Sequence, residues 1–273
     1  MSTTTAGGAP VVNASASLPN VMRAEWIKLW SLRSTYWTLG TLVVVSIGLT
    51  ILSTWITARN WDGTDPADKA TFNPTDITQG FGLFLGMLFI SVLGVLVISG
   101  EYSTGGIRTT LTAVPQRMTL LGAKAAVFLA VALGVNLVIA FGSFFVGSFF
   151  LSAEDIQASL GDDGVFRAVL GGALFVTGCG LFSFALGALL RRTAAGITAA
   201  LGGLLVVPTL GALLPGSWGD RVNDYIITNA GSQIAQVDAD PDALAPWTGY
   251  LVFLIWGVGL LVIAAVMMQR RDA

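Results

Sequence analysis

The amino-acid sequence predicts an all-α, polytopic membrane protein in which an N-terminal interfacial helix precedes six transmembrane helices. Charged residues make up only 11% of the 273-residue chain and hydrophobic residues make up 54%, whereas ordinary globular domains are roughly 25% charged. A soluble protein of this size needs more polar side chains to cover its surface. The chain also contains six apolar stretches, and one bilayer crossing takes about 20 apolar residues. These observations argue against a soluble enzyme.

The N-terminal region divides into a tail and a helix. Residues 1–20 have no charged side chain and are rich in Ser, Thr, Ala and Gly, so we expect a disordered tail. Residues 21–34 are expected to form a helix with Asn20 as its N-cap. This helix is either a straight extension of the first span or a separate helix lying in the membrane interface, and we favour the second interpretation. Its apolar face would carry Met22, Trp26, Leu29 and Trp30, with Glu25, Lys28 and Ser31 on the opposite face.

Residues 35–273 are expected to form one transmembrane domain. Its six spans run approximately over residues 35–56, 81–99, 123–151, 165–190, 196–214 and 246–268. The third span is too long for an upright crossing, so it tilts, kinks near Gly134, Asn136 or Gly142, or projects from the membrane.

The distribution of charge predicts the orientation of the chain. Six spans place both termini on the same side, and the segments on that side hold ten of the 14 Lys and Arg residues but only three of the 16 Asp and Glu residues. The net charge is therefore +7 on that side and −9 on the other, which together give the −2 of the whole chain. Because Lys and Arg are in excess in the cytosolic segments of membrane proteins, we expect both termini to be cytoplasmic.

The residue types that the chain lacks exclude several kinds of site. It has no histidine and one cysteine, Cys179, which excludes an internal disulfide and the usual metal ligands. None of its three lysines lies in the Gly-Lys-Ser/Thr context of a phosphate-binding loop. We expect a non-catalytic subunit with no cofactor or metal of its own and no nucleic-acid partner. Energy for uphill transport has to come from another chain.

The centres of the predicted spans contain no Asp, Glu, Lys or His, which disfavours a proton- or ion-coupled carrier. The uncharged polar residues within the spans have two interpretations. The first is that they form hydrogen bonds between helices, which is the more common role, and the second is that they line a path for an amphiphilic substrate. The candidates for lining such a path are Asn136, Ser143, Thr177 and Ser183.

The loop between the second and third spans carries the most specific pattern. Glu101 ends the second span, and Gly105 and Gly106 allow a turn. Residues 107–114 suit a short helix that Pro115 closes.

This loop resembles the cytoplasmic loop of type-2 ABC transporter permeases, and the opening segment, residues 23–29, resembles the actinobacterial members of that family. The layout of spans agrees with the family over the whole chain, whereas the matching motifs cover about 45 residues. The matching loop positions are Glu101, Gly106, Ile107, Arg108, Leu111, Pro115, Arg117 and Lys124.

The resemblance implies a permease subunit driven by a separately encoded ABC ATPase, which would hold ATP and Mg. The ATPase would dock on the loop of residues 100–124 and on the interfacial helix. Ile107 and Leu111 would then supply the buried contact, with Arg108 at its rim, while Glu101 would anchor the short helix to a basic group. The interfacial helix would contribute Glu25, Trp26, Lys28 and Trp30.

The resemblance also implies an assembly and a location. Two permease chains, identical or similar, would form the pathway and export a hydrophobic or amphiphilic substrate across the cytoplasmic membrane of a bacterium. Residues 215–246 would be either short re-entrant helices or a structured loop. The alternatives are a membrane-anchored sensor or assembly subunit without transport of its own and, less favoured, a secondary carrier.

Overall fold

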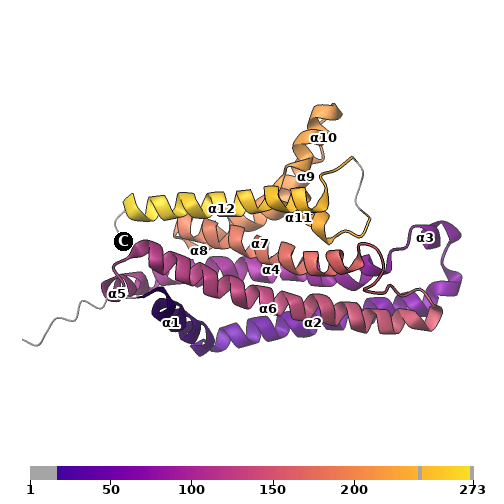
Figure 1. Cartoon of the computed structure of the whole chain (residues 1–273), viewed down its shortest axis with the longest axis horizontal. Helices are drawn as coiled ribbons and strands as arrows, with labels where there is room; N and C mark the ends of the chain where they lie inside the picture. The colour runs from indigo at the N-terminus through magenta and orange to yellow at the C-terminus, as the bar shows by residue number, and fades with distance from the viewer. Residues whose placement is uncertain (1–16, 239–241, 271–273) are drawn as a thin grey trace, which may run out of the picture.

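The structure, a computed structural model, describes residues 17–238 and 242–270, within which every regular element is a helix. The long helices lie side by side in one bundle (Figure 1). The short helices α1 (Leu18–Ser31) and α5 (Gly106–Ala113) lie at the end of the bundle that carries the C-terminus, and α3 (Pro66–Ala70) lies at the other end. Most of the predicted tail lies outside the described residues, but its last three residues already belong to α1.

Six helical segments are long and apolar enough to cross a membrane, as predicted. They are α2 (Arg33–Asn60), α4 (Pro74–Ser103), α6 (Arg117–Leu151), α7 (Val165–Leu190), the combined α8, η3 and α9 (Thr193–Gly211), and α12 (Pro246–Arg270). The fourth span has the predicted bounds. The second begins seven residues earlier than predicted, at Pro74, because the polar side chains of its first turns are buried in the bundle. Gln79, for example, donates from Nε2 to the carbonyl oxygen of Ala140 at 2.9 Å.

The core of the bundle is the contact between α4 and α7, which is the most extensive contact between any two elements described. In the most apolar 18-residue stretch of α7, 78% of the residues are buried, whereas the corresponding share is 22–28% in α2, the fifth span and α12. Small residues allow this close approach. A Cβ atom at Gly94 of α4 would lie 2.8 Å from the carbonyl oxygen of Gly180 in α7.

The third span, α6, runs as one uninterrupted α-helix of 35 residues through Gly134, Asn136 and Gly142. At 1.5 Å per residue it is about 52 Å long, whereas the hydrocarbon core of a bilayer is about 30 Å thick. The helix is therefore too long for an upright crossing, as predicted, and whether it tilts, kinks or projects stays a prediction.

The fifth span is interrupted by a π-helical turn, η3 (Gly202–Val206), between α8 (Thr193–Leu201) and α9 (Val207–Gly211). Pro208 has no backbone N–H and so cannot bond the carbonyl oxygen of Leu204 four residues earlier. The hydroxyl of Thr228 donates to that oxygen instead, at 2.8 Å. Thr228 belongs to α11 (Ile227–Ser232), so this bond fixes α11 against the irregular turn.

The segment before the last span is helical over much of its described length, rather than a plain loop. It comprises α10 (Gly216–Asp224), α11 (Ile227–Ser232) and η4 (Gln233–Ala235). Figure 1 shows α10 projecting away from the side of the bundle. Whether these helices enter a membrane stays a prediction.

The N-terminal helix α1 is separate from the first span, as favoured by the sequence. Leu32 lies between α1 and α2 in an extended conformation, with φ −85° and ψ 114°, so the chain changes direction there. The predicted N-cap is wrong, because α1 begins at Leu18 with Ser17 in the N-cap position and Asn20 lies within the helix.

Candidate functional site

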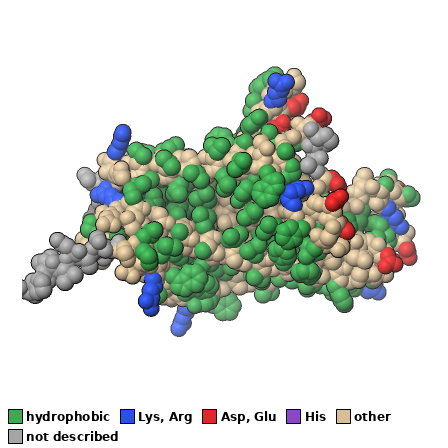
Figure 2. Space-filling model, in the orientation of Figure 1, with side chains coloured by type: hydrophobic (Ala, Val, Ile, Leu, Met, Phe, Trp, Pro, Cys, Tyr) green, Lys and Arg blue, Asp and Glu red, His purple; other side chains and the backbone are tan. Residues whose placement is uncertain are grey.

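Charge divides the bundle into two ends. On the face shown in Figure 2, Asp and Glu side chains gather at the end near α3 and on α10, and none is visible at the end near the C-terminus. We call the end with α1, α5 and the last turn of α12 the basic end, and the opposite end the acidic end. The division agrees with the predicted charge split, although the structure contains no membrane to orient it.

At the basic end, four ionised side chains form one cluster inside the protein. Lys124 on α6 donates from Nζ to Oε2 of Glu25 on α1 at 2.5 Å and to Oε1 of Glu101 on α4 at 2.6 Å. Lys28 on α1 makes an ion pair with the same Oε1 of Glu101. The side chain of Lys124 is 2% exposed and those of both glutamates are 9% exposed, whereas that of Lys28 is 46% exposed. The cluster is neutral overall and joins three helices.

Glu101 pairs with two basic groups, Lys28 of α1 and Lys124 of α6, whereas the predicted anchoring of the short helix α5 through Glu101 stays a prediction. Removing one partner of a buried ion pair costs about 3–5 kcal/mol, because the remaining charge is left uncompensated in the interior. Oε2 of Glu101 is buried and has no hydrogen-bond partner among the described residues. The carboxylate therefore depends on the two lysines for its stabilisation.

The prediction that Glu25 lies opposite the apolar residues of α1 is wrong. The residues that α1 buries are Val21, Glu25 and Leu29, four residues apart along one stripe, so Glu25 lies on the face that packs against α6. Trp26, expected on the apolar face of an interfacial helix, is 46% exposed. The difference arises because Lys124 offers Glu25 a counter-charge inside the bundle, which makes burial of a carboxylate favourable at this position.

Exposed and partly buried aromatic side chains surround the corner between α1 and α2. The ring centroids of Trp26 and Trp30 are 5.7 Å apart, and those of Trp30 and Tyr36 are 5.1 Å apart. Trp37 is 77% exposed. Tryptophan and tyrosine are enriched at membrane–water interfaces, so this corner has the composition of an interfacial segment.

The short helix predicted in the loop is present as α5. Gly105 precedes it in the left-handed region at φ 72°, a conformation that glycine adopts without strain. Ile107, however, is 3% exposed and belongs to the chain's own core. The prediction that Ile107 supplies a contact to another protein is therefore wrong, and Leu111 is partly buried against the same core.

The surface that α5 and the following turn present consists of other residues. The backbone of Arg108 lies in α5, but its side chain lies outside what the structure describes, so its placement at a rim stays a prediction. Arg117 donates from Nη1 to the carbonyl oxygen of Met268 at 2.7 Å, which fastens the start of α6 to the last turn of α12. The exposed residues are Thr109, Thr112, Pro115, Gln116 and Met118.

The four candidates for a substrate path are not gathered into one opening. Thr177 and Ser183 on α7 donate to carbonyl oxygens four residues earlier in their own helix, at 2.7 and 2.8 Å. The hydroxyl of Ser143 and Nδ2 of Asn136, both on α6, are buried without a hydrogen-bond partner among the described residues. Thr177 and Ser183 therefore bond within their own helix rather than between helices, and of the four candidates Ser143 and Asn136 each leave one polar atom unsatisfied. Which of the two predicted roles these residues have stays a prediction.

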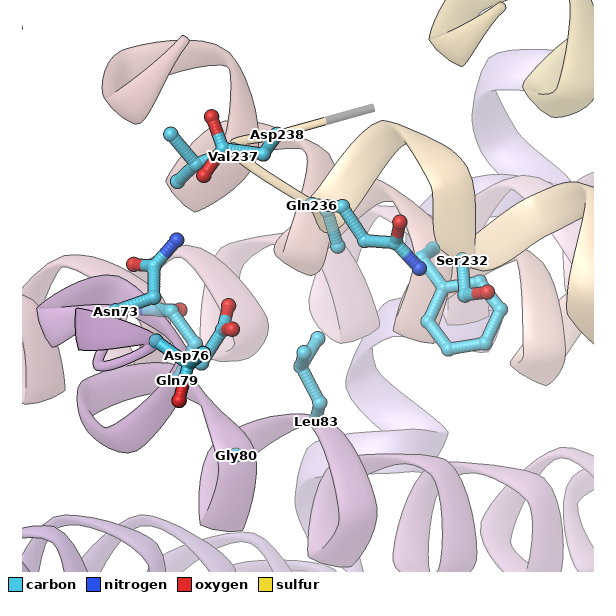
Figure 3. A pocket seen from close by; sticks show the side chains of 12 residues that line it. Asn73, Asp76, Gln79, Gly80, Leu83, Ser232, Gln236, Val237 and Asp238 are labelled. Carbon is cyan, nitrogen blue, oxygen red and sulfur yellow. The ribbon is translucent and has the colours of Figure 1, made fainter. Parts of the chain in front are cut away.

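The acidic end carries a hollow of about 460 Å³ that the sequence analysis missed. Figure 3 shows Asp76 and Gln79 of α4 on one side of it and Gln236 and Asp238 on the other. Arg167 at the start of α7 holds the second side in place by donating to the carbonyl oxygens of Gln236 and Val237, each at 2.9 Å. The sequence held one indication of this hollow. The polar residues just before the predicted second span belong to the first turns of α4 and line the hollow at the acidic end.

The architecture and the charge division define a multi-pass α-helical membrane protein. Comparison of the chain with models of known protein families and with curated proteins gives no match.

Proposed function

We propose that this chain is the permease subunit of an ABC transporter, driven by a separately encoded ATPase that binds ATP and Mg and docks at the basic end. The proposal combines the resemblance of residues 100–124 to type-2 permeases with the position of α5. The observation that carries it is the buried cluster, in which Glu101 at the end of α4 pairs with Lys28 of α1 and Lys124 of α6.

The cluster supplies a path for movement from a docked ATPase into the membrane. A groove of about 360 Å³ between α1 and α5 is lined by Val21, Ala24, Thr109 and Val114 among others, and it is the proposed seat for part of the ATPase. A displacement of α1 acts on Glu101 through its ion pair with Lys28, and a displacement of α5 acts on the end of α4, which α5 follows directly in the chain. Since α4 packs most extensively against α7, a shift of α4 would alter the centre of the bundle.

The basic end is cytoplasmic in this proposal, and the chain lies in the cytoplasmic membrane of a bacterium. Export of a hydrophobic or amphiphilic substrate is the direction that the resemblance implies. A second permease chain, identical or similar, completes the pathway, because two of the four candidate residues, Thr177 and Ser183, bond within their own helix rather than lining an opening.

The orientation is tested by cysteine labelling in intact cells with a membrane-impermeant thiol reagent. In a Cys179→Ser background, Ser159→Cys at the acidic end should react, and Ser103→Cys at the basic end should react only after the membrane is permeabilised. Both positions are exposed, so access to the reagent depends on the side of the membrane. Labelling of Ser103→Cys from outside would overturn the orientation.

The function itself is tested by isolating the chain from its native membranes. We expect an ATPase to co-purify in a 1:1 ratio to the permease, in a particle with two copies of each. Mass measurement of the purified particle gives both ratios. A particle that contains a permease monomer and no ATPase, in membranes that hydrolyse ATP normally, would contradict the proposal and favour an anchored sensor or assembly subunit.

A further inference from the structure

A second groove at the basic end has a composition that differs from that of the docking groove. It has a volume of about 420 Å³ and lies between the corner of α1 and α2 on one side and α4 on the other. Its apolar wall is formed by Leu29, Leu32, Leu93, Leu96, Val97 and Val127. Polar side chains line the other part, among them Lys28 of the buried cluster and Ser34, Thr35 and Thr38 at the start of α2. The groove is thus amphipathic.

The groove opens on a surface that faces lipid in a membrane. Two of its wall residues are exposed, Leu32 between α1 and α2 and Leu96 on the spanning helix α4, and exposure of an apolar side chain on a spanning helix is favourable in contact with acyl chains. Tyr36 and Trp37 flank its polar part and are also exposed, and such residues sit at the level of the lipid headgroups. The polar part therefore lies at headgroup level and the apolar wall continues toward the hydrocarbon.

Four charged side chains line this groove, Glu25, Lys28, Glu101 and Lys124, so its lining is neutral overall, and Lys28 is the one whose side chain is substantially exposed. Among the described residues of the basic end, the carboxylates are Glu25 and Glu101, and both are buried in ion pairs. Lys28 is the half-exposed member of the cluster, and its ammonium group has three donors, of which one serves Glu101. Arg33 is exposed at the start of α2 beside the groove. Basic pockets between transmembrane helices on the cytoplasmic side suit anionic headgroups.

We propose that this groove binds an anionic phospholipid. Its phosphate accepts hydrogen bonds from Lys28 and from the hydroxyls of Ser34 and Thr38, and one acyl chain lies along the apolar wall between α2 and α4. The inference stands on the groove and its exposed lysine, and it holds whether or not an ATPase docks on α5. Bound lipid would lie against the helices that the buried cluster joins.

The test is native mass spectrometry of the full-length chain. The purified protein in detergent is incubated with equal amounts of phosphatidylglycerol and phosphatidylcholine that have identical acyl chains, and the detergent is removed in the spectrometer. Wild-type protein should retain phosphatidylglycerol with a preference of about fivefold, the ratio expected for one lysine near an anionic lipid. Lys28→Gln should reduce this preference toward one. Lys69→Gln, which changes a lysine near the acidic end, should leave it unchanged.

A second pair of variants keeps the cluster intact. Thr38→Trp fills the groove and should abolish retention of the phospholipid, whereas Thr41→Trp, on an exposed position of the same helix, should not. Equal retention of the two lipids by the wild-type chain would overturn the proposal, as would an unchanged preference in both Lys28→Gln and Thr38→Trp. Loss of a dimer in Thr38→Trp without loss of lipid would assign the groove to a second copy of the chain instead.

Discussion

Replacing Lys124 with Met should destabilise the protein by about 3–5 kcal/mol. The ammonium group of Lys124 lies 2.5 Å from Glu25 and 2.6 Å from Glu101, and its side chain is 2% exposed. Without it, Glu25 keeps a buried carboxylate with no other ion-pair partner among the described residues, and Glu101 keeps only Lys28. The measurement is thermal or denaturant unfolding of the purified chain in detergent.

Lys28→Met is the matched control for this prediction. Lys28 is half-exposed, and Glu101 retains Lys124 when Lys28 is removed, so the loss should be about 0–1 kcal/mol, as for exposed ion pairs. Adding Glu25→Gln to Lys124→Met should restore part of the stability, because a neutral amide needs no counter-charge. Equal destabilisation by Lys124→Met and Lys28→Met would show that the buried cluster does not hold the three helices together.

The sequence predicted the six spans because their signal is local. Apolar composition over about 20 residues decides whether a segment crosses a membrane, and each span carries that signal in its own residues. The start of α4 was missed because Thr75, Thr78 and Gln79 are polar and yet buried. Their burial depends on partners such as the carbonyl oxygen of Ala140, which is 61 residues from Gln79, and no local pattern reveals such a partner.

The candidate site could be predicted only in part for the same reason. The periodicity of α1 correctly predicted a helix, but it assigned Glu25 to the polar face because its partner, Lys124, is 99 residues away. One signal was present in the sequence: Lys124 lies within an apolar run, and a buried lysine requires a counter-charge. Glu25 and Glu101 were the carboxylates available on that side before the C-terminus. The burial of Ile107 could not be predicted, since an apolar residue on a short helix fits its own core as well as a partner.

The burial of Ile107 changes which residues of α5 are proposed to meet the ATPase. Thr109 and Thr112 are exposed and lie three residues apart, so they share one face of the helix. Thr112 donates to the carbonyl oxygen of Thr109 at 2.7 Å, and among the described residues neither hydroxyl bonds another element. Leu111 is less informative as a test position, because it packs against the chain's own core and a charge there would disturb the permease itself.

The double variant Thr109→Glu/Thr112→Glu should therefore reduce the amount of ATPase that co-purifies with the permease by at least about tenfold, which corresponds to about 1.4 kcal/mol. The physical reason is that two carboxylates would have to be taken out of water in the docked complex, and burying unpaired charge costs several kcal/mol. The amount of permease and its own oligomeric state should not change, because both side chains point away from the core. Thr71→Glu/Ser159→Glu, two exposed positions at the acidic end, is the control and should retain the ATPase in full. An undiminished ratio of ATPase to permease in the α5 variant would mean that the ATPase binds elsewhere on the chain, and the coupling role assigned to α5 and Glu101 would then be wrong.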